Sequence, residues 1–548
     1  MREQQTAAPS QGKAKSGKFT KTRRAIPGRV ISGSPLYGLA SASLLAVLVL
    51  TLPVGHAQQA PSAPIKSQTK SQTKPQPETH ITPEQGKELF RSVDELIKFA
   101  SQETGLPVKH EVKRTLTTRA AVEKYLTDKF DEDEDAKRMQ RGEIVLKKFG
   151  LLDRDFNLKP FMLALLKEQI AGYYDSKTKT VYMLDWIDPE TQKPVLVHEL
   201  THALQDQHTD LEKWGDQTPD DVSHNATEDN DHLAKDEMDT ARTAALEGQA
   251  MAVFLDYSLK PSGRSIIKNP EILDELPNQS AGDDSPVLAR APLLLSESLL
   301  FPYKDGLSFE QDVWMDKGRD AAFAGVLDRP PASSWEVMNP RAYEQSKQSP
   351  LLVLPDIHTL LNKRYRAYDI GQVGQLDLRI LAQIFGGDGA ARELTPAWDG
   401  GIYWAGQLLS AKTPEEQDST KSIALMYLSA WKNNASAQVF ARMYAEDLGR
   451  KYSGVKLAKE EVSSASRRDE VVYNTNEGPV LITVRGKFVF VSESFDLETA
   501  RQLTDLLIDG QGTGEIRTAS TAPKQPDLSQ SWISFLHSCG MMKAGLPR

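Results

Sequence analysis

Two histidines and a glutamate at close spacing are the residues of this 548-residue sequence with the clearest chemical meaning. His198 and His202 are four positions apart, and Glu199 directly follows the first of them. On a helix, side chains four apart lie on one face with Cβ atoms about 5–6 Å apart, so two imidazoles can bind one zinc ion. The neighbouring carboxylate can take a proton from water on that metal. The HExxH spacing therefore predicts a hydrolytic zinc site, although so short a motif also arises by chance.

A catalytic zinc usually has three protein ligands, so two histidines leave it one short. The best candidate for the third is Glu247, which lies in the small-residue run Ala245–Ala250 of a helix expected over residues 238–259. Such a run permits close approach of another helix, whereas Gly248 otherwise costs a helix interior about 1 kcal/mol. The alternative is an exposed glutamate on an amphipathic helix. The predicted Zn²⁺ ligands are His198, His202 and Glu247, and the predicted general base is Glu199.

These residues resemble a known class of enzymes. The two histidines followed by Glu-Gly-Gln-Ala are similar to the gluzincin class of zinc metallopeptidases, in which a glutamate from a later helix completes the site. The sequence more closely resembles a group of uncharacterised bacterial metallopeptidase-like proteins, over about residues 160 to 345. Where that group often has a histidine before proline, this chain has Asn339, and no role is carried onto it. The segments with the resemblance are Gly172–Asp175, Val197–His208, Ala245–Ala250, Phe301–Gly306, Arg329–Ser334 and Asn339–Tyr343.

The resemblance implies a zincin-like fold and a zinc ion, and it supplies no substrate. The helix with the two histidines is expected over residues 194–207, and residues 171–185 are expected to form a β-hairpin just before it. In zinc peptidases the free edge of such a strand can pair with an extended peptide substrate. The alternative is a hairpin that only covers the core. Further helices are expected to begin at Thr82 and to cover residues 119–130 and 158–170.

Other polar residues near the motif are weaker candidates. Asp206 could orient an imidazole from behind, with helix capping or plain solvation as the alternative. His208 is six positions after His202, so on a continuing helix it points to a different face and is not expected to bind the metal. The candidate donors to a developing oxyanion are Tyr173, Tyr174 and Tyr303, with no ground for choosing among them.

Residues 206–239 contain twelve acidic and two basic residues. Few of their neighbours are apolar, so the stretch is expected to form a long surface excursion. His224 and His232 are interpreted as solvated loop histidines within it.

The N-terminus has the pattern of an export signal. Basic residues from Lys13 to Arg29 precede an uncharged run over residues 36–54, and Gly55 and Ala57 lie where a signal peptidase cuts. Either the chain is cut after Ala57 and released to the periplasm or the exterior, or the uncleaved run tethers it to the inner membrane. The expected organisation is a signal or anchor over residues 1–57, a disordered linker over 58–80, a metallopeptidase domain over 81–345 and a C-terminal region over 346–548.

Composition excludes several classes of function. The net charge of −9 gives no support for nucleic-acid binding. The single cysteine, Cys539, excludes an internal disulfide framework and a Cys-rich metal site, so a tight metal site must use histidines and carboxylates. The metallopeptidase hypothesis implies a peptide or protein substrate as the partner.

The C-terminal region gives weaker signals. Residues 350–355 are expected as a short strand or buried segment, residues 376–385 as a helix, and residues 398–405 as a strand turn. Residues 479–492 predict a hairpin that turns at Arg485-Gly-Lys. The expected fold class is α+β: a mainly helical, zincin-like domain with a small edge sheet, followed by an α+β region.

The leading hypothesis is an exported zinc-dependent metallopeptidase. The alternative is a cell-envelope binding or scaffold protein that keeps a metallopeptidase-like fold without turnover. The presence of Glu199 favours catalysis, because a zinc-binding scaffold needs the histidines but has no need of that base.

Overall fold

The structure is a computed structural model, and it describes residues 80–132, 134–215, 225–266, 268–269, 271–272, 286–458 and 469–511. The expected export segment over residues 1–57, almost all of the linker, His224 and Cys539 lie outside these residues. Within them, no helix combines the length and apolarity that crossing a membrane requires. The fold class is α+β, as expected, with two separate sheets.

A three-stranded sheet stands beside the helix with the two histidines. Its strands are β1 (Lys113–Thr117), β2 (Tyr173–Asp175) and β3 (Thr180–Leu184), in the order β1-β3-β2. β1 runs parallel to β3, and β2 pairs antiparallel with β3. The hairpin predicted over residues 171–185 is therefore confirmed, and β2 is one edge of the sheet.

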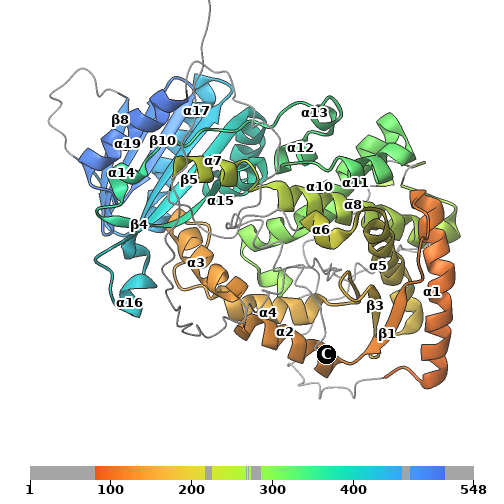
Figure 1. Cartoon of the computed structure of the whole chain (residues 1–548). Helices are drawn as coiled ribbons and strands as arrows, with labels where there is room; N and C mark the ends of the chain where they lie inside the picture. The colour runs from red at the N-terminus through yellow and green to blue at the C-terminus, as the bar shows by residue number, and fades with distance from the viewer. Residues whose placement is uncertain are drawn as a thin grey trace, which may run out of the picture. The chain divides into compact units, whose positions relative to one another are not determined.

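Three long helices pack in series beside this sheet: the first contacts β2 and β3, the second packs on the first, and the third packs on the second (Figure 1). They are α5 (Pro189–Thr209), α8 (Met238–Leu259) and α10 (Leu293–Lys317). α5 begins where Asp188 accepts hydrogen bonds from the N–H groups of Glu190 and Thr191, with a proline at the first helical position. α1 (Pro83–Thr104) packs on α5 and begins with the capping box predicted at Thr82. α5 starts five residues before the predicted boundary, because its N-cap lies before Pro194, which the helix contains.

The other helices of this half are shorter. They are α2 (Arg119–Glu132), α3 (Glu134–Phe149), α4 (Leu158–Gln169), α6 (Leu211–Gly215), α7 (Ala226–Leu233), η1 (Lys260–Ser262), η2 (Leu288–Arg290), the π turn η3 (Ala321–Gly325), α11 (Val326–Asp328), α12 (Ser334–Met338), α13 (Pro340–Glu344) and α14 (His358–Leu361).

The expectation of a surface excursion over residues 206–239 is wrong for its second part. Asp229, His232 and Leu233 of α7 are buried, as are Asp236 and Glu237 directly after it. α7 packs on strand β4, which lies more than a hundred residues later in the chain (Figure 1). Three acids of this part, Asp229, Asp236 and Glu237, therefore have partners in the interior and do not belong to a solvated loop.

The second sheet has seven strands, all antiparallel, in the order β4-β5-β6-β10-β9-β8-β7. The predicted hairpin over residues 479–492 is confirmed, since β9 pairs with β10 around Gly486. The strand turn expected over residues 398–405 is wrong, because these residues lie in one strand, β5 (Trp398–Leu408), whose pairing with its neighbour shifts in register between Trp398 and Gly401. The strands are β4 (Tyr365–Gln372), β5 (Trp398–Leu408), β6 (Ile423–Trp431), β7 (Lys456–Leu457), β8 (Glu470–Thr475), β9 (Gly478–Arg485) and β10 (Phe488–Glu493).

Both faces of this sheet are covered (Figure 1). Alternate residues of β6 show the period of two: Leu425 and Tyr427 belong to one hydrophobic core, and Met426 and Leu428 to another. The first core also contains side chains of α5, so apolar packing continues across the boundary expected near residue 345. The helices of this part of the chain are α15 (Gln375–Leu394), η4 (Thr395–Ala397), α16 (Pro414–Gln417), η5 (Thr420–Ser422), α17 (Asn434–Glu446), α18 (Leu448–Lys451) and α19 (Leu497–Gly510), of which α17 and α19 pack on the strands of the hairpin.

Two glycines bring α8 and α10 into backbone contact. A Cβ on Gly248 would lie 2.2 Å from the carbonyl oxygen of Gly306, and a Cβ on Gly306 would lie 2.1 Å from that of Ala244. No side chain fits at either position without separating the helices. This contact explains why a glycine interrupts a helix interior directly after Glu247, and it fixes the depth at which that carboxylate lies.

Gly248→Ala is therefore expected to lower the free energy of unfolding by about 1–3 kcal/mol, because overpacking outweighs the gain in helix propensity. Urea denaturation measures the change. The matched control is Gly142→Ala in α3, where nothing lies within 4 Å and the same substitution is expected to stabilise the protein by about 0.5–1 kcal/mol. A Gly248→Ala protein as stable as the parent would contradict the close contact.

Candidate metal centre

Helices α5 and α8 bring His198, His202 and Glu247 together in the interior. The Nε2 atoms of the two histidines are 3.1 Å apart, and Oε2 of Glu247 lies 3.0 Å from that of His198 and 3.5 Å from that of His202. All three side chains are at most 1% exposed. Together they form a buried group that could hold a metal ion.

The separations match what a tetrahedral ion requires. Ligand atoms about 2.0–2.2 Å from a tetrahedral zinc lie roughly 3.3 Å from one another, and the three observed separations bracket that value. Without an ion, three atoms with lone pairs converge on one point. In addition, Oε1 of Glu247 is buried and has no hydrogen-bond partner among the residues described. The donor set, two imidazoles and a carboxylate, therefore fits a divalent cation such as zinc.

The electrostatics of the group follow from burying one carboxylate between two imidazoles. Burial raises the pKa of Glu247, but the charges of the two histidines and their hydrogen bonds to the carboxylate together outweigh it and lower this pKa to about 2. Burial lowers the pKa of His202, yet the charge and hydrogen bond of Glu247, with the charge of Glu199 and the Gln205 contact, together raise it to about 9. Burial also lowers the pKa of His198. The metal-free group thus holds a proton on His202, which a bound cation would displace.

The expected base, Glu199, is held by the edge strand of the small sheet. The backbone N–H of Tyr174 in β2 donates to its Oε2 over 2.8 Å, and Glu199 is completely buried. β2 is buried along its whole length. The edge expected to pair with an extended substrate is therefore turned toward α5 and covered in this conformation.

The polar residues that were weaker candidates for the site mostly contact other parts of the protein. Asp206 accepts from the Tyr174 hydroxyl at 2.6 Å and from the Leu211 N–H, so capping and packing, not an imidazole, account for it. His208 lies against Asp328 at 2.9 Å, away from the other histidines, as expected. Among the three tyrosines, it is Tyr303 whose ring lies along His198, with centroids 6.5 Å apart.

Sequence reasoning missed Gln205, which contacts the metal group from behind. Its Oε1 lies 2.7 Å from Nδ1 of His202, and its side chain is fully buried. The available signal was its spacing, because a residue three after His202 lies on the same face of the helix.

Sequence reasoning also missed a cluster of buried acids after α7. Glu237 accepts from the Ser334 hydroxyl at 2.5 Å, and Asp377 accepts from the N–H of Gly374 at 2.7 Å. Burial raises the pKa of Glu237 to about 7, against the Ser334 bond and with help from the charge of Asp236. Burial and the charge of Glu237 raise the pKa of Asp377 well above its usual range. His232, expected in solvent, is buried 3.5 Å from Asp236.

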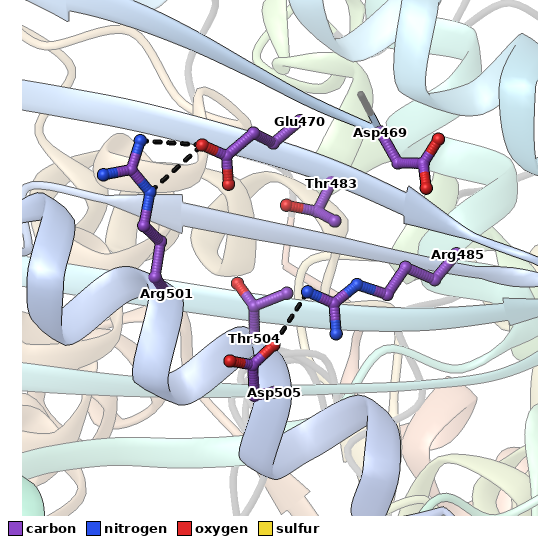
Figure 2. Close-up of a pocket in the computed structure, with 7 residues that line it drawn as sticks. All are labelled: Asp469, Glu470, Thr483, Arg485, Arg501, Thr504 and Asp505. Carbon is purple, nitrogen blue, oxygen red and sulfur yellow. Dashed lines mark hydrogen bonds and ion pairs between the residues drawn. The ribbon is translucent and has the colours of Figure 1, made fainter. Parts of the chain in front are cut away.

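A separate cavity of about 290 Å³ lies between α19 and strands β8 and β9 (Figure 2). Its two cations are already paired: Arg501 donates to Glu470 at 2.7 Å, and Arg485 lies 2.7 Å from Asp505 (Figure 2). It belongs to the seven-stranded sheet and not to the helices with the metal group. Both arginines of the cavity thus already have a carboxylate partner within the protein.

No family model, curated protein or solved structure matches this chain. The resemblance to gluzincins therefore stays a prediction based on the residues themselves.

The metal group predicts that the purified protein binds about one divalent ion per chain. Glu247→Gln, which removes the charged ligand with little change of shape, is expected to weaken zinc affinity by more than about 100-fold, since loss of an outer contact alone costs about 10–100-fold. Competition with a chromogenic chelator measures the affinity. Glu446→Gln, at an exposed position of α17, serves as the control. Equal affinities of Glu247→Gln and the parent protein would remove Glu247 from the ligand set.

The buried acids predict a pH dependence of stability. A carboxyl whose pKa is raised from about 4.5 to about 7 by folding binds its proton more tightly in the native state, so stability falls as pH rises through this window and levels off above it. Glu237→Gln keeps the acceptor for Ser334. It should reduce the loss of unfolding free energy between pH 5 and pH 8 by on the order of 2 kcal/mol. Urea denaturation at both pH values measures it. Glu228→Gln, an exposed change in α7, should leave the loss unaltered.

Proposed function

We propose that this protein is a zinc-dependent metallopeptidase that hydrolyses peptide bonds. The observation that carries the proposal is the convergence of two imidazole nitrogens and one carboxylate oxygen within 3.5 Å, beside a second carboxylate that is not part of the group. A structural zinc site is usually closed by four protein ligands, whereas a catalytic one has three and leaves a position for water. Three ligands and a separate Glu199 match the catalytic case.

The chain's own residues divide the remaining work. Zinc bound at this group would supply Lewis-acid polarisation of a water molecule and of the substrate carbonyl. Glu199 would take a proton from the water and pass it to the leaving amine. The Tyr174 N–H holds one oxygen of Glu199, so the base keeps one orientation before substrate arrives. Gln205 contacts His202 from the side away from the other ligands.

The likeness to gluzincins and the signal-like N-terminus extend the proposal. A glutamate from a later helix completes the site in that class, and we assign this role to Glu247 on α8, which lies beside the two histidines. The zincin-like character of residues 81–345 and export to the periplasm or exterior belong to the same proposal. A peptide or protein is the substrate class, with no nucleic acid involved.

A second candidate is a cell-envelope binding or scaffold protein with a non-catalytic metal site. The observation that favours it is burial: His198, Glu199 and His202 are fully buried, and Glu247 is 1% exposed. A peptide reaches them only if a covering element moves. Turnover and metal content together separate the two candidates.

Glu199→Gln decides between them. As a peptidase, the parent cleaves a diverse peptide library and the variant keeps about one zinc while losing about 10²–10⁴-fold in turnover, because only the base is removed. Mass spectrometry of the peptides and metal analysis provide the two measurements. Glu190→Gln, exposed in the first turn of the same helix, is the matched control and should retain activity. Zinc without cleavage in the parent protein would support the scaffold, and cleavage by Glu199→Gln at the parental rate would exclude Glu199 as the base.

A further inference from the structure

We propose that Gln205 and Gln249 are positioning residues that determine which nitrogen of His202 is left to face the metal. Their two side-chain amides form a series of hydrogen bonds, here called the chain of amides, that runs from a π turn to the imidazole of His202. The inference rests on the proposed metal site, but it does not depend on peptidase activity.

The chain has three links, all in the interior. Gln249 Nε2 donates to the carbonyl oxygens of Ala322 and Phe323, at 2.9 and 3.1 Å. Gln205 Nε2 donates to Oε1 of Gln249 at 2.9 Å. Gln205 Oε1 then lies 2.7 Å from Nδ1 of His202. Both glutamines are completely buried, so water does not compete for these bonds.

The direction of the chain is fixed at its far end. An amide side chain can usually be turned over, exchanging its oxygen for its nitrogen. Here that is excluded for Gln249, because its Nε2 faces two carbonyl oxygens, which only accept hydrogen bonds. The two carbonyls belong to η3, a π turn, a type of turn that occurs often at functional sites. Gln249 must therefore present its oxygen to Gln205.

A second carbonyl fixes Gln205 independently. Its Nε2 also donates to the backbone oxygen of Leu246 in α8, at 3.0 Å. Turning this amide over would place oxygen against oxygen at Leu246 and at Gln249. The side chain therefore presents its oxygen to His202 for two separate reasons.

The imidazole has one arrangement that satisfies this contact. Gln205 Oε1 accepts only, so Nδ1 of His202 must donate and therefore has the hydrogen. A neutral imidazole then has its lone pair on Nε2, the atom that faces His198 and Glu247. The ring is thus held in the form and orientation that bind a metal, as outer contacts do for histidine ligands in general. No such contact runs through Asp206, which the sequence had suggested for this role.

The first measurement is the position of the ring proton in the metal-free protein labelled with ¹⁵N-histidine. Long-range ¹H–¹⁵N correlation at pH 10, where a neutral ring has one proton, is expected to place it on Nδ1 of His202, with slow exchange with water. His202→Asn assigns the signal. A proton on Nε2 in the parent protein would overturn the proposal.

The second measurement is zinc affinity, by competition with a chromogenic chelator. Gln205→Met removes every polar atom of the link and should weaken binding about 10–100-fold, with loss of the protected Nδ1–H signal. Gln249→Met leaves the contact between Gln205 and Leu246 in place and should weaken zinc binding less than Gln205→Met does. The matched control is Gln311→Met, because Gln311 is also buried and donates to a single backbone carbonyl, that of Ile266, outside the chain of amides.

The outcomes separate this proposal from the proposed function. A protein with the proton on Nδ1 that binds zinc but cleaves nothing keeps the positioning role and loses the peptidase. Parental affinity and signal in Gln205→Met would overturn the positioning role even in an active peptidase. If Gln205→Met does not fold, as judged by circular dichroism, the proton position in the parent and the affinity of Gln249→Met decide alone.

Discussion

A single carboxylate in a dry interior is the constraint on which the metal centre depends. Glu247 is out of reach of water, and an isolated charge there would be strongly disfavoured. Two imidazoles supply the compensation, either with a proton on His202 or by sharing a cation with it. The same charge that makes the metal-free group protonated makes it receptive to a divalent ion. Metal affinity should accordingly depend on pH, since protons and metal compete for the same lone pairs.

The large-scale architecture keeps that carboxylate at its depth. The backbone contact between α8 and α10 leaves no room for side chains at Gly248 and Gly306, so two glycines set how closely the helix with Glu247 approaches α10. Apolar packing then continues from α5 into one face of the seven-stranded sheet. The C-terminal region is therefore part of the support for the site and not merely an appendage. The same continuity encloses the site, which links its rigidity to its lack of exposure.

Local features could be predicted from the sequence, and long-range ones could not. The spacing of His198 and His202 predicted their shared face because helix geometry is local. Glu247 followed from counting ligands, which is a chemical argument and needs no fold. Gln205 had a local signal, its spacing of three from His202, but its link to η3 through Gln249 did not, because nothing in residues 321–325 indicates a π turn. The acids near α7 were misjudged because composition cannot show that a distant strand, β4, will cover them.

The π turn has a consequence for how changes in this protein should be interpreted. A π turn holds one more residue than an α turn, so removing one residue from Ala321–Gly325 would restore ordinary helix spacing and shift the two carbonyls away from Gln249. Every metal ligand would remain in the sequence. A deletion more than a hundred residues after the histidines could thus weaken metal binding while the HExxH motif stays unchanged. Helix length at this position is as much a part of the site as the histidines are.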